Sequence, residues 1–282
     1  MEEKELGVWA EPEGFFSVFR CTNQKYAEAF LKKGEIKFST PSSWVKYAFE
    51  KGEGRGDKLE GTMATFHAHD IERIVQLNQK YGIYPDLIRM NMDQRVYLKR
   101  SRDMELPCFC MYLLKQSMFD CPSEEGKHKI TATVPGSYFR DFMDNQDPQE
   151  VEKLDQFVKP AVIIINDFKE FERRIISALT AIGVKKEEVI ISRVTYMDFD
   201  KYGEYGWWDF GQKSPMELTI KHTRFENQSE ARIIVNTDDE SIKKILAKPI
   251  EIGSLEDIAT VSNTYLHEGM LIEATVDLYS YD

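Results

Sequence analysis

The sequence lacks the motifs that identify several common classes of enzyme. It contains no Gly-x-x-x-x-Gly-Lys phosphate loop, no Gly-x-Gly-x-x-Gly at the start of a helix, no His-Glu-x-x-His and no Gly-x-Ser-x-Gly. These absences argue against kinases and other phosphate-loop proteins, dinucleotide-binding dehydrogenases, zinc proteases and the common serine hydrolases.

Long apolar runs and a cysteine framework are also missing. The apolar stretches, such as residues 161–165, are far too short to cross a bilayer, and the first residues have neither the cationic start nor the apolar run of a signal peptide. Four cysteines in 282 residues are too few for a disulfide framework. We therefore expect a cytoplasmic protein with reduced thiols and no membrane partner.

An excess of basic residues is missing as well, because the formal net charge is -11. Binding to a phosphate backbone depends on clustered Lys and Arg, so this charge argues against generic nucleic-acid binding. Hydrophobic residues make up 42% of the chain, which is enough for a packed core. No repeat or Pro-rich linker divides the sequence. We predict a single α+β domain over residues 1–282, with a glycine-rich surface loop at residues 50–61.

Residue patterns predict a mixed, largely antiparallel sheet with a few flanking helices. Aromatic and β-branched residues favour strands, and a helical period followed by Gly predicts a helix and its end. The predicted helices cover residues 24–33, 70–80 and 167–183. The predicted strands cover residues 14–20, 35–39, 62–69, 94–99, 106–115, 161–165, 189–199, the end of 220–235, 248–252 and 274–280.

Several segments resemble a bacterial and phage domain family of unknown function. The opening of the pattern is residues 19–44, which include Phe-Arg and Phe-Ser-Thr-Pro. Later matches are an Asp and Glu-Gly loop at residues 55–61, a central strand at 109–112, Glu-x-Arg-Ile within 225–233 and Ile-Gly-x-Leu-x-Asp-Ile at 252–258. The resemblance therefore extends over residues 18–258, and it implies a common fold without implying an activity.

A more distant resemblance is to ADP-ribosyltransferases of the toxin type. These enzymes carry an Arg at the end of an early strand, then a Ser-Thr-Ser-like turn, then Gln-x-Glu at the start of a late strand. The corresponding residues here are Arg20, the Ser39-Thr40-Pro41-Ser42 turn, and Gln228 with Glu230. Pro41 moves the last hydroxyl of the turn to Ser42. The resemblance implies an ADP-ribosyltransferase-like fold that uses NAD as its substrate.

The resemblance assigns a role to each of these residues. Glu230 would stabilise the oxocarbenium-like ion formed when the nicotinamide–ribose bond breaks, and Gln228 would orient an unknown macromolecular acceptor. Arg20 would bind the pyrophosphate of the dinucleotide. The hydroxyls of Ser39, Thr40 and Ser42 would hold the bound cofactor and brace Glu230.

Each of these residues also has a purely structural interpretation. A strand-end Arg is often an ion-pair partner, Ser-Thr-Pro-Ser is a turn that can cap a helix, and Glu230 with Arg232 can form a salt bridge. A non-catalytic module that binds a nucleotide or a protein, with a role in phage–host conflict, is therefore an alternative function. The sequence leaves the oligomeric state open.

A metal-dependent hydrolase or nuclease is a further alternative. His67 and His69 would point to the same side of a strand, and Asp57 and Glu60 are near them in sequence. We nevertheless predict no metal site, because a solvent-facing strand carries such residues without a metal. The aromatic segment 202–210, with Trp207 and Trp208, could stack on a base or cover the core.

Overall fold

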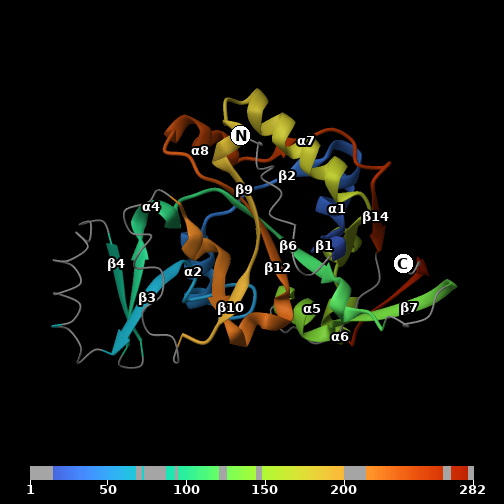
Figure 1. Ribbon diagram of the computed structural model, residues 1–282, viewed down its shortest axis with the longest axis horizontal. Coiled ribbons are helices and arrows are strands. Elements are labelled where there is room, and N and C mark those ends of the chain that lie inside the picture. The colour runs from blue at the N-terminus through green and yellow to red at the C-terminus, as the bar shows by residue number, and fades with distance from the viewer. Residues whose placement is uncertain are drawn as a thin grey trace, which may run out of the picture. The chain divides into compact units, whose positions relative to one another are not determined.

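The computed structural model describes residues 15–67, 72, 87–92, 95–120, 126–143, 148–199, 214–262 and 268–278. It confirms a mixed α+β architecture, which Figure 1 shows as a ribbon. Two compact units can be distinguished. Unit 1 contains residues 1–35, 111–175 and 251–282, and unit 2 contains residues 36–110 and 176–250. The prediction of a single domain stays a prediction.

The largest sheet has six strands in the order β14-β8-β1-β6-β12-β9. Strand β1 is antiparallel to both β6 and β8, and β8 is antiparallel to β14. Strands β12 and β9 are antiparallel as well. Strand β6 (Cys108–Lys115) begins in unit 2 and continues in unit 1. The predicted antiparallel sheet is thus confirmed, whereas the ADP-ribosyltransferase-like arrangement stays a prediction.

Unit 1 is built on the first three strands of this order and on a long two-stranded ribbon. Phe19 of β1 stacks on Tyr112 of β6, with ring centroids 6.0 Å apart, and Ile130, Val134 and Phe139 pack in the same core. Its elements are β1 (Phe15–Asn23), α1 (Gln24–Lys33), η2 (Gln116–Met118), β7 (Gly126–Pro135), α5 (Gly136–Phe142), α6 (Pro148–Glu152), η3 (Gln156–Val158), β8 (Pro160–Ile165), the first part of α7 (Phe168–Ala181), β14 (Ala259–Ser262) and β15 (Gly269–Leu278).

Helices α1 and α7 lie side by side in unit 1 (Figure 1), joined by Phe30 and Phe171, whose ring centroids are 5.9 Å apart. Helix α1 ends where predicted, because Gly34 has φ 63°, a left-handed conformation that glycine adopts without strain. A Cβ at this position would lie 2.2 Å from the carbonyl oxygen of Gly253. Gly34 is therefore required both by its backbone angle and by the close approach of a second chain segment.

Unit 2 contains the other large group of elements. These are α2 (Pro41–Lys51), β3 (Thr62–His67), β4 (Leu87–Met92), β5 (Arg95–Arg100), α4 (Ser101–Met104), η4 (Lys186–Glu188), β9 (Val189–Arg193), β10 (Thr195–Met197), η6 (Met216–Thr219), β11 (Ile220–His222), η7 (Thr223–Gln228), β12 (Glu230–Val235) and α8 (Glu240–Leu246). Strand β5 pairs with β3 and β4, and β10 pairs with β11. The short strand β2 (Glu35–Ile36) pairs with β13 (Ile250–Glu251).

The Ser-Thr-Pro-Ser turn starts helix α2. Thr40 is the N-cap, its hydroxyl accepts a hydrogen bond from the backbone N–H of Ser43, and the Ser43 side chain completes a capping box. Pro41 stands at the first helical position, where its missing N–H costs nothing and its fixed φ suits the helix. The structural interpretation of this turn as a helix cap is confirmed.

The prediction of a surface loop at residues 50–61 is wrong for much of this segment. Residues 50 and 51 belong to α2, and the side chains of Asp57 and Glu60 are only 1% exposed. Glycine here permits close packing, because a Cβ on Gly56 would lie 2.6 Å from the Trp44 carbonyl oxygen. Dense charge and glycine are typical of solvent-exposed loops, but in this segment ion pairs allow the carboxylates to be buried.

Most other predicted elements lie close to their expected positions. The predicted strand at 35–39 is shortened to β2 and a single bridge at Ser39, and the predicted strand at 189–199 is divided into β9 and β10 at Val194. The predicted helix at 70–80 lies outside the described residues apart from residue 72. Within the described part of the chain, no helix has the length and hydropathy needed to span a bilayer.

Candidate functional site

A buried cluster of charged residues lies in unit 2, centred on Arg232 of strand β12. The Arg232 guanidinium binds both carboxylate oxygens of Glu60, one of them at 3.0 Å, and its Nε donates to Glu230 Oε1 at 2.6 Å. It also donates to the Leu218 carbonyl oxygen and lies 5.1 Å from the centroid of the Trp44 ring. Arg232 is 0% exposed, so this side chain is fully enclosed by its partners. We call Glu60, Lys221, Gln228, Glu230 and Arg232 the ion cluster.

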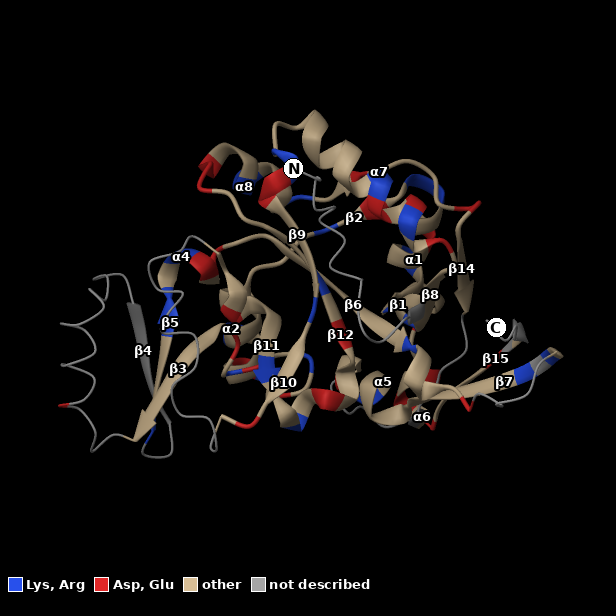
Figure 2. Cartoon of the chain, in the orientation of Figure 1, with Lys and Arg blue, Asp and Glu red and all other residues tan. Residues whose placement is uncertain are grey.

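The two predicted catalytic residues belong to the ion cluster. Lys221 of β11 donates from Nζ to Gln228 Oε1 at 2.6 Å and to Glu230 Oε2 at 2.9 Å. The amide nitrogen of Gln228 donates to the Gly54 carbonyl oxygen at 2.8 Å. Both carboxylate oxygens of Glu230 therefore accept hydrogen bonds from buried cations, and both ends of the Gln228 amide are bonded. Strand β12 bears both signs of charge (Figure 2).

Local strand geometry explains why Glu230 and Arg232 meet. Alternate residues of a strand point to the same face, so Glu230 and Arg232 are neighbours on one side of β12. Burial by itself would raise the pKa of Glu230, but the charges of Arg232 and Lys221 outweigh burial and hold the pKa well below its usual range. Glu230 is therefore an ionised structural partner of two cations.

Two ionisable groups near the ion cluster, Asp57 and Lys99, have pKa values that burial shifts toward the neutral form. Burial, with a smaller contribution from the charge of Glu60, raises the pKa of Asp57 to about 6. One oxygen of Asp57 accepts from the Leu59 backbone N–H at 2.8 Å, whereas its Oδ2 is buried and has no hydrogen-bond partner in the described structure. Burial also lowers the pKa of Lys99 to about 8. Both shifts oppose the charged forms of these side chains.

We expect Asp57→Asn to change how stability depends on pH. The carboxyl has a higher pKa in the folded chain than the ordinary aspartate value of 3.8, so the folded state binds more protons. The contribution of Asp57 to stability is full below about pH 4 and is lost as the pH rises through about 6. As the pH rises from 4 to 7.5, the free energy of unfolding of the variant should increase by about 1–3 kcal/mol relative to that of wild type.

Urea denaturation of both proteins at these two pH values checks this prediction. The quantity compared is the difference in free energy of unfolding between variant and wild type, because other carboxyls titrate in the same pH range and affect both proteins equally. Glu53→Gln is the control, since Glu53 pairs with the same Arg224, at 2.8 Å, without being fully buried. An Asp57→Asn advantage that is equal at both pH values would contradict the prediction.

The strand cysteines do not form a reactive site. Cys108 and Cys110 both lie in β6, and Cys108 is buried. Burial raises the pKa of both thiols, so neither is a thiolate at neutral pH. Cys21 in unit 1 is also buried, and Cys121 lies outside the described residues. The expectation of reduced cysteines without a disulfide stays a prediction.

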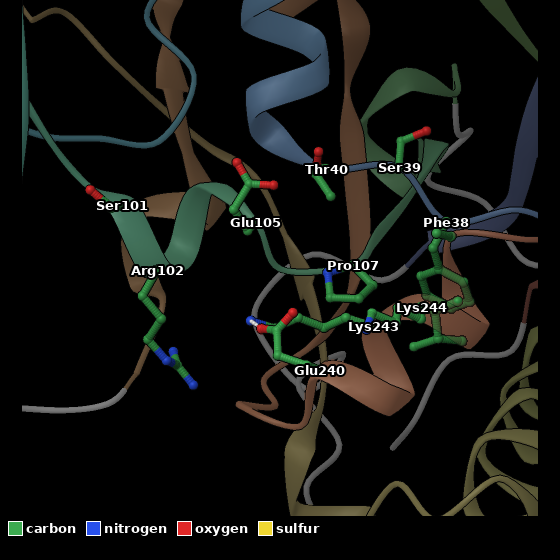
Figure 3. A pocket seen from close by; sticks show the side chains of 12 residues that line it. Phe38, Ser39, Thr40, Ser101, Arg102, Glu105, Pro107, Glu240, Lys243 and Lys244 are labelled. Atoms are coloured by element: carbon green, nitrogen blue, oxygen red, sulfur yellow. Dashed lines mark hydrogen bonds and ion pairs between the residues drawn. The ribbon is translucent and has the colours of Figure 1, made fainter. Parts of the chain in front are cut away.

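A pocket of about 490 Å³ in unit 2 contains two of the predicted cofactor-binding residues. Ser39 and Thr40 lie on one side of it, and Lys243 and Lys244 of α8 lie on the other (Figure 3). We call this the lysine pocket. Its lining residues are Phe38, Ser39, Thr40, Ser101, Arg102, Glu105, Pro107, Glu240, Lys243, Lys244, Leu246 and Ala247.

The lining of the lysine pocket combines hydroxyls with a small excess of positive charge. Three cationic side chains and two carboxylates line it. Lys243 donates to Glu240 Oε1 at 2.9 Å, whereas Lys244 is exposed and has no ion-pair partner within the described part of the chain. The Lys244 ammonium is therefore available to an anionic ligand.

The structure brings together some of the predicted site residues. Ser39 and Thr40 line the lysine pocket, and the Ser42 hydroxyl lies 3.0 Å from that of Thr40 in the first turn of α2. Gln228 and Glu230 are in the ion cluster and are not among the residues that line the pocket. Arg20 lies in β1 of unit 1. The grouping of Arg20 with the other five residues stays a prediction.

The metal-site alternative gains no support from the described residues. His67 is exposed at the end of β3, with its Nε2 at 3.4 Å from Arg95 Nη1, and His69 lies outside the described residues. Asp57 and Glu60 are buried beside cations. In the part of the chain that the structure describes, no group of three His, Cys, Asp or Glu side chains is placed to hold a metal ion. Segment 202–210, with Trp207 and Trp208, also lies outside the described residues.

The sequence indicates one pair of the ion cluster, Glu230 with Arg232, but it does not reveal the other partners in the ion cluster or in the lysine pocket. The pairing of Glu230 with Arg232 is visible in the sequence as an i, i+2 spacing of opposite charges, but the third partner, Lys221, carries no such signal. Likewise, Arg102, Lys243 and Lys244 come from two short helices far apart in sequence. Only the folded chain places them around Ser39.

Comparisons with protein-family models, with curated proteins and with solved structures gave no match for this chain.

Proposed function

We propose that this protein binds a nucleotide in the lysine pocket, with NAD as the first ligand to test. The observation that carries the proposal is the meeting of Ser39 and Thr40 with the available ammonium of Lys244 around one cavity. A volume of about 490 Å³ lies within the range of roughly 300–1,000 Å³ that is usual for small-molecule pockets.

The chemistry of each wall supports this proposal. The Lys244 ammonium is a point charge that can bind a phosphate oxygen, and the neighbouring Lys243 adds to the positive potential. Ser39 has its backbone N–H and carbonyl bonded to Cys108, while its hydroxyl has no partner among the described residues. This hydroxyl can donate to a ribose oxygen. Phe38 and Leu246 give the pocket an apolar side for a base or ribose.

The proposal is one of binding rather than catalysis. For ADP-ribosyl transfer, Glu230 would have to leave Arg232 and Lys221, and Gln228 would have to leave Lys221 and Gly54. Each of these bonds is buried, and breaking them leaves unpaired charges that are costly in a protein interior. The catalytic roles of Glu230 and Gln228, and transfer to a macromolecular acceptor, stay predictions. A nucleotide-binding module is what the described geometry supports best.

We expect Lys244→Glu to weaken nucleotide binding by tenfold or more. The change replaces an attractive charge by a repulsive one at the pocket wall, and tenfold corresponds to about 1.4 kcal/mol. The measurement is isothermal titration calorimetry with NAD, ADP-ribose and AMP. The matched control is Lys248→Glu, which makes the same change of charge just beyond α8 at an exposed residue that does not line the pocket.

Two results would oppose the proposal. If none of the three ligands binds to the wild-type protein at millimolar concentration, the pocket is not a nucleotide site. If a ligand binds and both lysine variants weaken it equally, binding follows the total charge of the surface rather than the pocket. Thermal midpoints of both variants, measured without ligand, show that each is folded.

A further inference from the structure

A second buried group of charged residues lies in unit 2, distinct from the ion cluster. It contains Arg100 of β5, Asp103 of α4 and Glu217 of η6, whose side chains are 8%, 1% and 4% exposed. The Nε of Arg100 lies 3.1 Å from Asp103 Oδ2 and 3.4 Å from Glu217 Oε1. Two carboxyl groups thus face one guanidinium in a dry environment. We call Asp103 and Glu217 the acid pair.

The hydrogen bonds of the acid pair leave one oxygen of each carboxyl group without a donor. Asp103 Oδ1 accepts from Arg102 Nη1 at 2.7 Å. Asp103 Oδ2 and Glu217 Oε1 are buried and have no hydrogen-bond partner among the described residues. A buried acceptor without a donor is costly. The two carboxyl groups are close enough to form a hydrogen bond with each other once one of them is protonated, so a single proton can satisfy both.

The charges around the acid pair favour such a proton. Arg100 and Arg102 contribute two positive charges. Asp103, Glu217 and Asp238, which accepts from Arg102 Nε at 2.5 Å, would contribute three negative charges if all were ionised. Two buried carboxyl groups that share one site do not both ionise readily. Burial, together with the neighbouring Asp103, raises the pKa of Glu217 well above its usual range.

The other charged groups on the neighbouring elements face other partners. Lys221 of β11 and Arg232 of β12 belong to the ion cluster, and Lys99 and Arg95 of β5 donate to backbone carbonyl oxygens at 2.6 and 2.9 Å. Burial raises the pKa of the Cys108 thiol of β6 and keeps it neutral. The other titratable side chains of β3, β11 and α2 are at least partly exposed: His67, His222, Lys46, Tyr47, Glu50 and Lys51. The acid pair therefore interacts chiefly with the two arginines.

We propose that Asp103 and Glu217 share one proton at neutral pH, and that its release to solvent weakens the binding of anions in the lysine pocket. Arg102 connects the two, because it lines the pocket and bonds to Asp103. Loss of the proton adds one negative charge beside the Asp103–Arg102 pair, so the pocket attracts a phosphate less strongly. By linkage, a bound anion increases the proton affinity of the acid pair. The effect on the pocket rests on the proposed nucleotide binding, whereas the shared proton does not.

The shared proton is tested on the ligand-free protein with Glu217→Gln. The amide has the shape of a protonated carboxyl and can donate to Asp103 Oδ2, so the urea midpoint of the variant at pH 7 should equal or exceed that of wild type. Asp103→Asn should lower the midpoint, because Arg102 loses a charged acceptor. The infrared difference spectrum between wild type and Glu217→Gln should contain the carbonyl band of a protonated carboxyl. A lower midpoint for Glu217→Gln contradicts the shared proton, and so does a difference spectrum without this band.

The effect on the pocket is tested by calorimetry with NAD at pH 6 and pH 9, a range in which NAD itself does not titrate. The affinity of wild type should fall by about threefold or more as the pH rises. Glu217→Gln cannot release the proton and should lose less affinity over the same range. The matched control is Glu226→Gln, the same change at an exposed residue, which should behave like wild type.

The possible results separate the two proposals. An equal change of affinity with pH in all three proteins contradicts the effect of the acid pair on the pocket and leaves nucleotide binding in place. If wild type does not bind NAD, AMP or ADP-ribose at millimolar concentration, nucleotide binding and its regulation are both overturned. The urea midpoints and the infrared difference spectrum, measured without ligand, then still decide whether the acid pair holds a proton.

Discussion

Replacing Arg232 by Met is expected to destabilise the protein by about 3–5 kcal/mol, the usual cost of leaving buried charges without their partner. Arg232 is 0% exposed and pairs with both Glu60 and Glu230. Methionine fills part of the same volume, but it supplies neither the charge nor the hydrogen bonds. The two carboxylates would then lie close together in a dry environment with one cation, Lys221, beside Glu230.

Urea denaturation at pH 7.5 and pH 5 measures this effect. The loss of stability relative to wild type should be smaller at pH 5 than at pH 7.5. Carboxylates that lose their cation take up protons more readily and become neutral. Arg173→Met is the control, since Arg173 bonds Glu170 at 2.7 Å with a side chain that is 67% exposed. That solvent-screened surface pair should contribute far less to stability than the buried cluster does. A loss of stability in Arg232→Met no larger than in the control would show that the ion cluster is unimportant for the fold.

Glu230→Gln is expected to destabilise the protein by about 2–4 kcal/mol, through the loss of one charge and of one acceptor. The amide has nearly the shape of the carboxylate, but it has only one oxygen for the two cations Arg232 and Lys221. Its NH₂ group must face an N–H donor of one of them. The loss should grow smaller only at strongly acidic pH, because the pKa of Glu230 lies well below its usual range.

Chemical denaturation of Glu230→Gln at neutral pH tests this prediction. The control is Glu226→Gln, the same change at an exposed residue four positions earlier in the chain, where an effect below about 0.5 kcal/mol is expected. Equal stability of the two variants would contradict a structural role for Glu230. It would also leave the carboxylate free for the catalytic role that the Gln-x-Glu pattern predicts.

The stability of Glu230→Gln affects how any NAD assay is interpreted. A loss of NAD cleavage in this variant has two explanations: the catalytic carboxylate is missing, or the stability of unit 2 is lower. Thermal midpoints and NAD affinity must therefore be measured on the same samples. Only a folded variant that still binds NAD, yet no longer cleaves it, supports catalysis by Glu230.

Local structure follows from the sequence where short-range signals are strong. Residues 24–33 have a clear apolar face and a terminal Gly34, and α1 has these bounds. Residues 161–165 form an apolar β-branched run, and β8 contains them. The sequence predicts that Asp167 starts the following helix, and its side chain accepts from the backbone N–H of Glu170 at 3.0 Å.

Burial of charge could not be predicted, because it depends on partners that are distant in sequence. Glu60 and Arg232 are 172 positions apart, and each alone has the composition of a surface residue. For the same reason, the glycines at residues 52–61 predict a solvated loop, although Gly56 packs against the backbone of α2. The sequence therefore identifies Ser39, Thr40 and Glu230 as residues of interest but does not separate the pocket from the ion cluster.

The strand pairing of unit 1 has a consequence for synthesis of the chain. Strand β1 pairs with β8, so that Arg20 faces Ile163, and β7 pairs with β15, so that Ala132 faces Ile272. Pairings this distant in sequence are typical of slow folding. A ribosome that adds about 5–20 residues per second exposes β1 for several seconds or more before β8 exists. During that interval the edge of β1 that later pairs with β8 has unpaired backbone N–H and carbonyl groups, beside aromatic side chains. We therefore expect chaperones to bind the nascent chain at β1, or aggregation to begin there.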